Sequence, residues 1–250
     1  MKQALARFTG TPVKAFVSGT LATGIAQSST ATTVTLIGFV SAGLITFAQS
    51  LWVVMGASLG TTGTGWVVST LGLKVQLGLY TLPIIGVGAL LRLLARGRWR
   101  HLGTALAGFG MLFVGIDTMQ EGMRGTGAQF ALEALNAEGW ATRLLALGAG
   151  VIMTVIMQSS TATVATTLTA LDAGALSFEL AAIMVIGAAI GTTLTGVLAA
   201  LGGSLYAKRT ALAHVLFNLS SGIIALLLLP GLLWILKLAQ THLGLQAGGV

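Results

Sequence analysis

The chain has 250 residues, of which 55% are apolar, 8% are charged and none is cysteine. A soluble domain carries about 25% charged residues, so this composition excludes a soluble enzyme with a polar surface and makes lipid the expected solvent. The net charge of +7 does not indicate nucleic-acid binding, because Lys and Arg in the cytoplasmic loops of a membrane protein explain it.

The first apolar segment, Val13–Leu44, predicts a re-entrant helical hairpin. A helix crosses the hydrocarbon core of a membrane with about 20 apolar residues. This segment is longer, and its middle is the polar tetrad Gln27-Ser28-Ser29-Thr30. Each arm reaches only about 20 Å at ~1.5 Å per residue. We therefore expect the tetrad at the tip of a hairpin, enclosed by protein that satisfies the unwound backbone.

The next segments predict a broken helix and two complete spans. Phe47–Leu71 is interrupted by the glycine-rich stretch Gly60–Gly65, and glycine costs a helix about 1 kcal/mol per residue relative to alanine. Complete spans are expected at Val75–Ala95 and His101–Met123, followed by an extramembrane loop over Arg124–Thr142.

The second half of the chain predicts the same order of elements. A second hairpin is expected over about Leu144–Gly174, and a second broken helix over Ala181–Leu201 with its break at Gly191-Thr192-Thr193. A last span follows at Thr210–Leu236. The expected fold is an all-α integral membrane protein with about five to six spans and two hairpins.

An internal repeat relates the two halves. The hexapeptide that begins at Gln27 recurs at Gln158, an offset of 131, and 20 of the 43 positions between residues 23 and 65 are identical to their partners at that offset. The offset is free of gaps over these positions, so the chain contains two copies of one unit. Such a repeat also argues against a cleaved N-terminal leader.

Counting crossings predicts that the copies are inverted. Three spans lie between the tetrads, since a re-entrant hairpin adds none, and an odd number reverses the orientation. With the turn near Arg98 in the cytoplasm, nine of the 13 Lys and Arg residues fall on that side, as the positive-inside rule requires. We expect one transport domain, with repeat one over residues 1–100 and repeat two over 101–250. The offset places the counterpart of the helix that opens repeat two before residue 1, so we expect either that repeat one lacks its first helix or that the symmetry is incomplete.

Two further motifs complete a family resemblance. Together with the duplicated tetrads and Gly-Thr-Thr breaks, Phe109–Asp117 and Ala211–Asn218 make the chain resemble the type II sodium-phosphate cotransporters, in a bacterial version without the PhoU-like C-terminal domain. The resemblance implies sodium-coupled symport of inorganic phosphate by alternating access. It also implies a multi-pass protein of the cell inner membrane.

The duplicated polar residues are the expected binding site. Discontinuous helices in inverted repeats bring helix N-termini toward anions and freed carbonyls toward Na⁺, and a hard cation prefers oxygen ligands. We expect phosphate at Gln27, Ser28, Ser29, Thr30, Gln158, Ser159, Ser160 and Thr161. We expect no cofactor. Sodium, as the coupling ion, is expected at Gln27, Ser29, Thr61, Thr62, Gln158, Ser160, Thr192, Thr193 and Asn218.

Alternatives stay open at this point. The Ser and Thr hydroxyls could simply bond to their own helix backbone, and His214 and Asn218 could form an interhelical contact. The residues do not separate phosphate from sulfate or a dicarboxylate, or a symporter from a passive anion channel. An enzyme is not expected, because no nucleophile, base and orienting group come together in the sequence. Membrane lipid is an expected partner, and a homodimer is one option.

Overall fold

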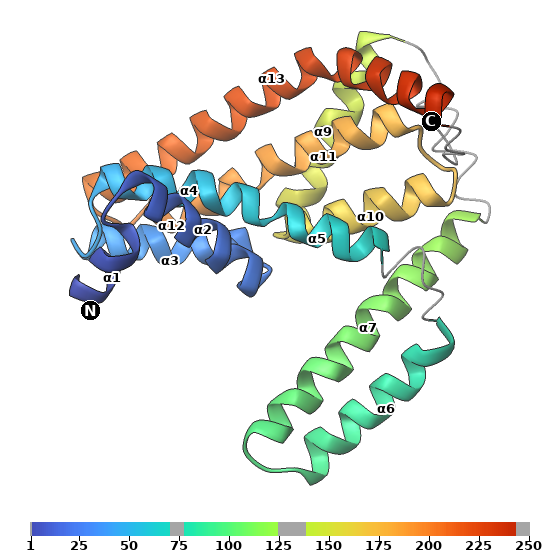
Figure 1. Cartoon of the computed structure of the whole chain (residues 1–250), viewed down its shortest axis with the longest axis horizontal. Coiled ribbons are helices and arrows are strands. Elements are labelled where there is room, and N and C mark those ends of the chain that lie inside the picture. Colours follow the sequence, from blue (N-terminus) through green and yellow to red (C-terminus); the bar gives the residue numbers. More distant parts are fainter. Residues whose placement is uncertain (1, 71–77, 125–138, 244–250) are drawn as a thin grey trace. The chain divides into compact units, whose positions relative to one another are not determined.

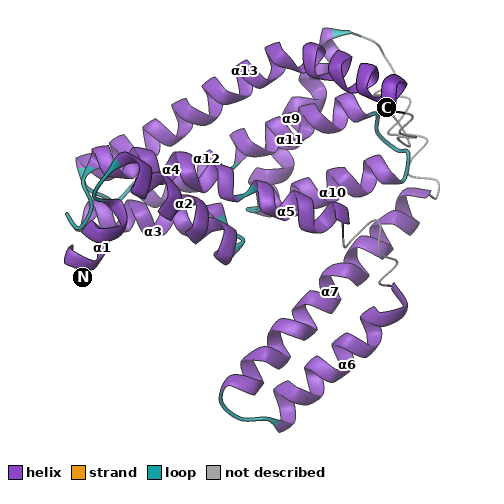
Figure 2. Ribbon diagram, in the orientation of Figure 1, coloured by secondary structure: helices purple, strands orange, loops and turns teal. Residues whose placement is uncertain are grey.

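A computed structural model describes residues 2–70, 78–124 and 139–243. Across these ranges the regular structure is helical and contains no strand (Figure 1, Figure 2). Within the described ranges, four segments are long and apolar enough to cross a membrane: Arg98–Met119, Trp140–Met157, Phe178–Ala200 and Leu205–Ala239. The expectation of an all-helical, multi-pass membrane protein is therefore confirmed.

The helices divide into two compact units. The first unit contains α1 (Lys2–Thr9), α2 (Pro12–Ala26), α3 (Ser29–Ser41), α4 (Phe47–Gly60), α5 (Thr62–Val67), α9 (Trp140–Met157), the start of α10 (Ser160–Asp172), α11 (Phe178–Gly191), α12 (Thr193–Ala200) and α13 (Leu205–Leu243). The second unit contains α6 (Gly78–Leu94), α7 (Arg98–Arg124) and the rest of α10.

The second unit is built around the α6–α7 hairpin. The two helices lie side by side (Figure 1) and turn at Gly97, whose φ of 60° suits glycine. A Cβ on Gly103 would lie 2.6 Å from the carbonyl oxygen of Gly88, so the backbones touch where both side chains are absent. Small residues at such a contact are typical of membrane helix packing.

In the first unit, glycines join each hairpin to the helix that follows it. A Cβ on Gly19 of α2 would overlap the carbonyl oxygen of Val53 in α4. At the matching positions of the second copy, a Cβ on Gly150 of α9 would overlap the carbonyl oxygen of Met184 in α11. The sequence repeat is thus also a repeat of helix packing, with α2 beside α4 and α9 beside α11 (Figure 1).

Helix α13 packs against both copies. It contacts α3 and α4 from the first copy and α11 and α12 from the second. The hydroxyls of Ser50 and Thr210 meet at 2.9 Å in the buried contact between α4 and α13. A Cβ on Gly222 would lie 3.0 Å from the Cδ1 of Ile190 in α11. The helix continues through Pro230, and its axis changes direction in its second half (Figure 1).

Some predicted boundaries were wrong. Helix α9 begins at Trp140, directly after Gly139 with its φ of 140°, so the end of the expected loop over Arg124–Thr142 is helical. The first arm of the second hairpin is consequently 18 residues long, which by length qualifies it as a candidate span. Helix α13 is also longer than expected, with 39 residues. Residues 75–77 and 125–138 of the expected elements lie outside the described residues.

The predicted helix breaks are confirmed in position but are milder than expected. Helix α4 gives way to α5 at Thr61, and α11 gives way to α12 at Thr192. Thr61 has φ −66° and ψ −25°, and Thr192 has φ −58° and ψ −26°. Both keep right-handed helical dihedrals. The helix is therefore interrupted at one residue.

Candidate functional site

The tip of each hairpin is formed by a glutamine in a left-handed conformation. Gln27 has φ 51° and ψ 30°, and Gln158 has φ 51° and ψ 27°. Each side chain folds back on the helix that it ends: Gln27 Nε2 donates to the carbonyl of Gly24 at 2.5 Å, and Gln158 Nε2 donates to that of Val155 at 2.6 Å. These bonds use the amide nitrogens, so each glutamine can direct its Oε1 oxygen elsewhere.

The serine after each glutamine caps the second arm of its hairpin. The Ser28 hydroxyl accepts a hydrogen bond from the backbone N–H of Ala31 at 3.1 Å, and the Ser159 hydroxyl accepts one from Ala162 at 3.2 Å. An accepting hydroxyl keeps its own proton for donation. Both serines are half-buried and can donate that proton to a ligand at the tip.

The remaining tetrad residues form the first turn of a 13-residue helix in each copy. Ser29 and Thr30 open α3, while Ser160 and Thr161 open α10. The first backbone N–H groups of a helix have no partner within it and point along the positive end of its dipole. Each tip thus offers N–H groups and hydroxyls to an anion without a cationic side chain.

A pair of threonines holds the two arms of each hairpin together. The Thr23 hydroxyl donates to the Thr32 hydroxyl at 3.0 Å, and at the matching positions Thr154 donates to Thr163 at 2.9 Å. Thr23, Thr154 and Thr163 are buried. The sequence prediction did not select these residues, although all four belong to the identical positions of the repeat. These two hydrogen bonds hold the two arms together next to the tip.

The threonines at the helix interruptions bond to their own helices. Thr61 donates to the carbonyl of Ala57 at 3.1 Å, and Thr192 donates to that of Ala188 at 3.0 Å. Thr62 and Thr193 donate to carbonyls three residues back, each at 2.7 Å. The alternative of back-bonding hydroxyls therefore holds for all four. Donating the proton leaves the oxygen lone pairs available, which is the state that a cation requires.

A direct contact joins the second hairpin to its interrupted helix. The Thr195 hydroxyl of α12 donates to Gln158 Oε1 at 3.0 Å. In the first copy, Gly63 lies close to Gln27, since a Cβ on Gly63 would be 3.9 Å from its Nε2. Thr195 was missing from the predicted site, although its identity with Thr64 at the repeat offset is a signal that could have found it.

Asn218 lies level with the interruption between α11 and α12. Four residues before it, His214 Nδ1 would be 3.1 Å from a Cβ on Gly196, and four residues after it, Gly222 meets Ile190. The side chains at these positions share one face of α13, which places the buried Asn218 opposite Thr192 and Thr193. Its Nδ2 donates to the His214 carbonyl at 2.9 Å, so its Oδ1 can serve a ligand.

Two side chains near Gly196 each contain a buried polar atom. His214 Nδ1 and Thr33 Oγ1 have no hydrogen-bond partner within the described part of the chain. Both side chains lie next to Gly196, at 3.1 Å for His214 Nδ1 and 3.6 Å for Thr33 Cγ2 from a Cβ built there. The Asn218 bond to the His214 carbonyl lies within α13, so within the described part of the chain the expected alternative of an interhelical bond applies neither to Asn218 nor to the His214 Nδ1 atom.

In the structure, the residues of the two predicted tetrads lie at the two hairpin tips. The predicted threonine pairs lie at the two helix interruptions. Gln158 contacts α12, and α3, which the first tetrad opens, packs against α12 and α13 of the second half. None of the hydrogen bonds described above joins one tetrad to the other.

Comparison with known proteins agrees with this duplicated site. The family model described as "Na+/Pi-cotransporter" matches the chain twice, over residues 1–121 and 122–246. The uncharacterized protein YqeW of Bacillus subtilis is 34% identical over 224 residues, which cover 87% of this chain and 69% of that protein. No solved structure matches the chain.

Two further relatives are named for phosphate transport. YjbB of Escherichia coli, whose name refers to inorganic phosphate export, is 29% identical over 85% of this chain and 38% of its own length. The human sodium-dependent phosphate transport protein 2C is 34% identical over 57% of this chain and 25% of its own length. The chain spans less than half of either protein. Because the family model accounts for both halves of the sequence, the chain belongs to the Na+/Pi-cotransporter family, a family of transporters and not of enzymes.

Proposed function

We propose that this chain carries out sodium-coupled symport of inorganic phosphate by alternating access in the inner membrane. The observation that carries the proposal is the matching geometry of the two tips. In each, a left-handed glutamine is followed by a capping serine and a helix N-terminus. Two equivalent half-sites favour a single substrate held between two elements that move relative to one another.

Phosphate suits the donors at the tips. The backbone N–H groups at the starts of α3 and α10, with the hydroxyls of Ser28, Ser29, Thr30, Ser159, Ser160 and Thr161, offer hydrogen bonds to the oxygens of a tetrahedral anion. Gln27 and Gln158 hold the turns in place through their Nε2 bonds. A site of neutral donors and helix dipoles binds an anion while still allowing its release.

Sodium suits the oxygens beside the tips. Thr61, Thr62, Thr192 and Thr193 have hydroxyls whose protons are directed into their own helices. The Oε1 atoms of Gln27 and Gln158, the hydroxyls of Ser29 and Ser160, and Asn218 Oδ1 complete the oxygen set that we propose for the coupling ions.

We further propose that the two copies are inverted repeats with re-entrant hairpins. Helices α2 and α3 have 15 and 13 residues and α10 has 13, so each reaches only about 20 Å, short of a ~30 Å hydrocarbon core. The 18-residue α9 reaches deeper than the other arms. A hairpin that enters and returns on one side explains these lengths together with the polar tip.

The rival candidates are a passive anion channel, a symporter of sulfate or a dicarboxylate, and a phosphate exporter. The exporter is favoured by the name of the Escherichia coli relative. A Na⁺ symporter moves phosphate in the direction of the Na⁺ gradient, whichever way that gradient is imposed, so phosphate movement that does not follow the gradient separates an exporter from a symporter.

Purified protein in liposomes should accumulate labelled phosphate only when external Na⁺ exceeds internal Na⁺. We expect Gln27→Ala and Gln158→Ala each to lower accumulation at least about tenfold, since each loses the oxygen donor and the bond that shapes the tip. Arg98→Ala, at the exposed start of α7, is the control and should retain uptake. Labelled sulfate and succinate should compete weakly with phosphate.

Each rival predicts a different result. Equal uptake in K⁺ and Na⁺ indicates a channel, and stronger competition by sulfate or succinate indicates another anion. Release of loaded phosphate that does not follow the imposed Na⁺ gradient indicates an exporter. Normal uptake by both glutamine variants contradicts the proposed site whatever the substrate is.

A further inference from the structure

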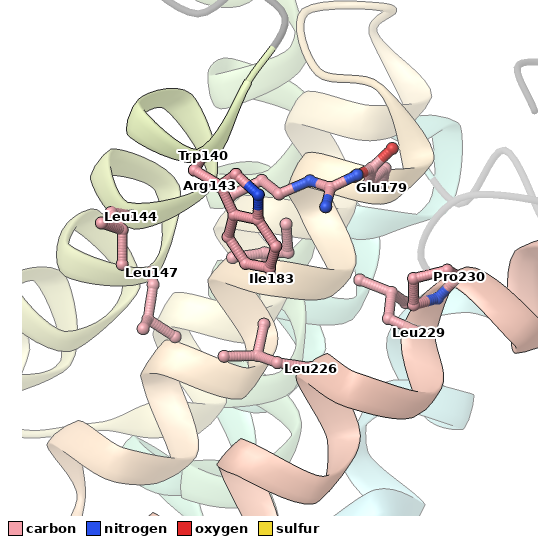
Figure 3. A pocket seen from close by; sticks show the side chains of 9 residues that line it. All are labelled: Trp140, Arg143, Leu144, Leu147, Glu179, Ile183, Leu226, Leu229 and Pro230. Carbon is pink, nitrogen blue, oxygen red and sulfur yellow. The ribbon is translucent and has the colours of Figure 1, made fainter.

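An apolar groove that no tetrad residue lines lies between α9, α11 and α13 (Figure 3). Aliphatic side chains from all three helices line it, among them Leu147, Ile183 and Leu226. Leu144 is 63% exposed, so the groove opens outward at the surface of these helices. In a membrane protein, such a surface faces hydrocarbon chains.

A charged pair closes one end of the groove. Arg143 Nη2 lies 2.7 Å from Glu179 Oε1, and the two side chains are 38% and 34% exposed. The Arg143 guanidinium also lies 5.3 Å from the ring centre of Trp140, which is 73% exposed. Exposed Trp beside a charged pair at the start of an apolar helix is typical of the membrane–water interface, where lipid headgroups lie.

The pair has hydrogen-bonding capacity left for a ligand. A guanidinium has five N–H donors and a carboxylate about four acceptor sites, and their mutual contact uses only part of both. The pair is neutral overall, but it presents a positive and a negative group side by side. The complementary ligand is a zwitterion whose negative and positive groups are neighbours.

We propose that this groove binds a phospholipid with a primary ammonium headgroup, such as phosphatidylethanolamine. One acyl chain lies along the aliphatic wall formed by Leu144, Leu147 and Leu226. The headgroup phosphate accepts hydrogen bonds from Arg143, and the ammonium donates to Glu179. Phosphatidylcholine has no N–H to donate to Glu179, and phosphatidylglycerol places a net negative charge beside that carboxylate.

Native mass spectrometry of the purified full chain tests this site by counting retained lipids. Dioleoyl phosphatidylethanolamine, phosphatidylcholine and phosphatidylglycerol are offered at equal concentration. We expect about tenfold greater retention of phosphatidylethanolamine, the factor that corresponds to one additional charge-assisted hydrogen bond. Glu179→Gln, which preserves the shape of the side chain, should reduce this retention to the level of phosphatidylcholine.

Two further variants separate the headgroup from the acyl chain. Leu226→Trp fills the groove while leaving the ion pair intact, and it should lower retention of all three lipids. Arg209→Gln is the matched control, because Arg209 also lies over an aromatic ring, 5.7 Å from Tyr206, and within the described ranges forms no ion pair with a carboxylate. It should behave as the wild-type chain does.

The proposal is overturned if the wild-type chain retains phosphatidylethanolamine and phosphatidylcholine equally, or if Glu179→Gln keeps the preference. It is also overturned if Leu226→Trp leaves lipid retention unchanged. That result is expected if another helix covers the groove, because lipid would then not enter it. Monodisperse elution and an unchanged helical circular dichroism spectrum establish that each variant is folded.

Discussion

At the scale of single residues, the two copies share a costly feature. Gln27 and Gln158 both adopt a φ of 51°, which costs a residue other than glycine or asparagine about 1 kcal/mol. Glycine would remove this cost but could not form the side-chain bond to the preceding turn. The same strained residue at the same place in both copies is most simply explained by a shared role at the tip.

The copies differ a few residues further on, where Thr33 of α3 corresponds to Val164 of α10. Thr33 is 2% exposed, and its hydroxyl has no hydrogen-bond partner among the described residues. We expect Thr33→Val to stabilise the folded protein by about 1 kcal/mol. The substitution removes a buried hydroxyl that gave up its hydrogen bonds to water on folding without forming a new one. Thermal unfolding in detergent should show a midpoint about 2–4 °C higher.

The neighbouring Thr32→Val is the matched control for that measurement. The Thr32 hydroxyl accepts from Thr23 and donates to the carbonyl of Ser28 at 3.1 Å, so its loss should lower the midpoint. A lower midpoint for Thr33→Val as well would mean that the Thr33 hydroxyl does have a partner in the folded protein.

At the scale of helices, close contact between glycines and facing carbonyls determines how each hairpin sits. Gly19 and Gly56 make this contact between α2 and α4. Gly150 and Gly187 make it between α9 and α11. Without a hydrophobic force between helices in lipid, such backbone contact supplies much of the packing energy. The tips are therefore held by pairs of helices that cannot separate without losing these contacts.

Most helix boundaries could be predicted from the sequence, because apolar length and polar interruptions decide them in a membrane. The turn at Gln27 and the interruptions at Thr61 and Thr192 are examples. The early start of α9 at Trp140 could not, since Thr142 and Arg143 resemble loop residues until Arg143 pairs with Glu179. The Thr195 contact to Gln158 likewise depends on how α12 packs, which no periodicity reveals.

The glycine contacts can be tested within one helix. Gly150→Ala should destabilise the protein by about 2–3 kcal/mol, because its Cβ would overlap the carbonyl oxygen of Met184. Gly148→Ala, two residues earlier in α9, meets nothing within 4 Å and should be neutral or stabilising, since alanine favours a helix by up to about 1 kcal/mol. Equal thermal midpoints for the two variants would contradict close packing of α9 on α11.

At the scale of the whole molecule, the distribution of charge predicts the orientation. The turn between α6 and α7 contains Arg96 and lies within a cluster of four arginines between residues 92 and 100. Lys208 and Arg209 mark the start of α13 in the second half. Placing both groups in the cytoplasm satisfies the positive-inside rule and leaves the start of α9 on the outer side.

Because the chain has no native cysteine, single cysteines can test this orientation. A membrane-impermeant maleimide should label Ala141→Cys in intact cells, and should label Arg96→Cys and Lys208→Cys only in inverted vesicles. All three positions are exposed. Crossing by α7 puts residues 96 and 141 on opposite sides, and crossing by α11 with α12 returns the chain to the cytoplasm before residue 208. Labelling of Arg96→Cys and Ala141→Cys from the same side would mean that α7 does not cross, and the two tetrads would then enter the membrane from one side.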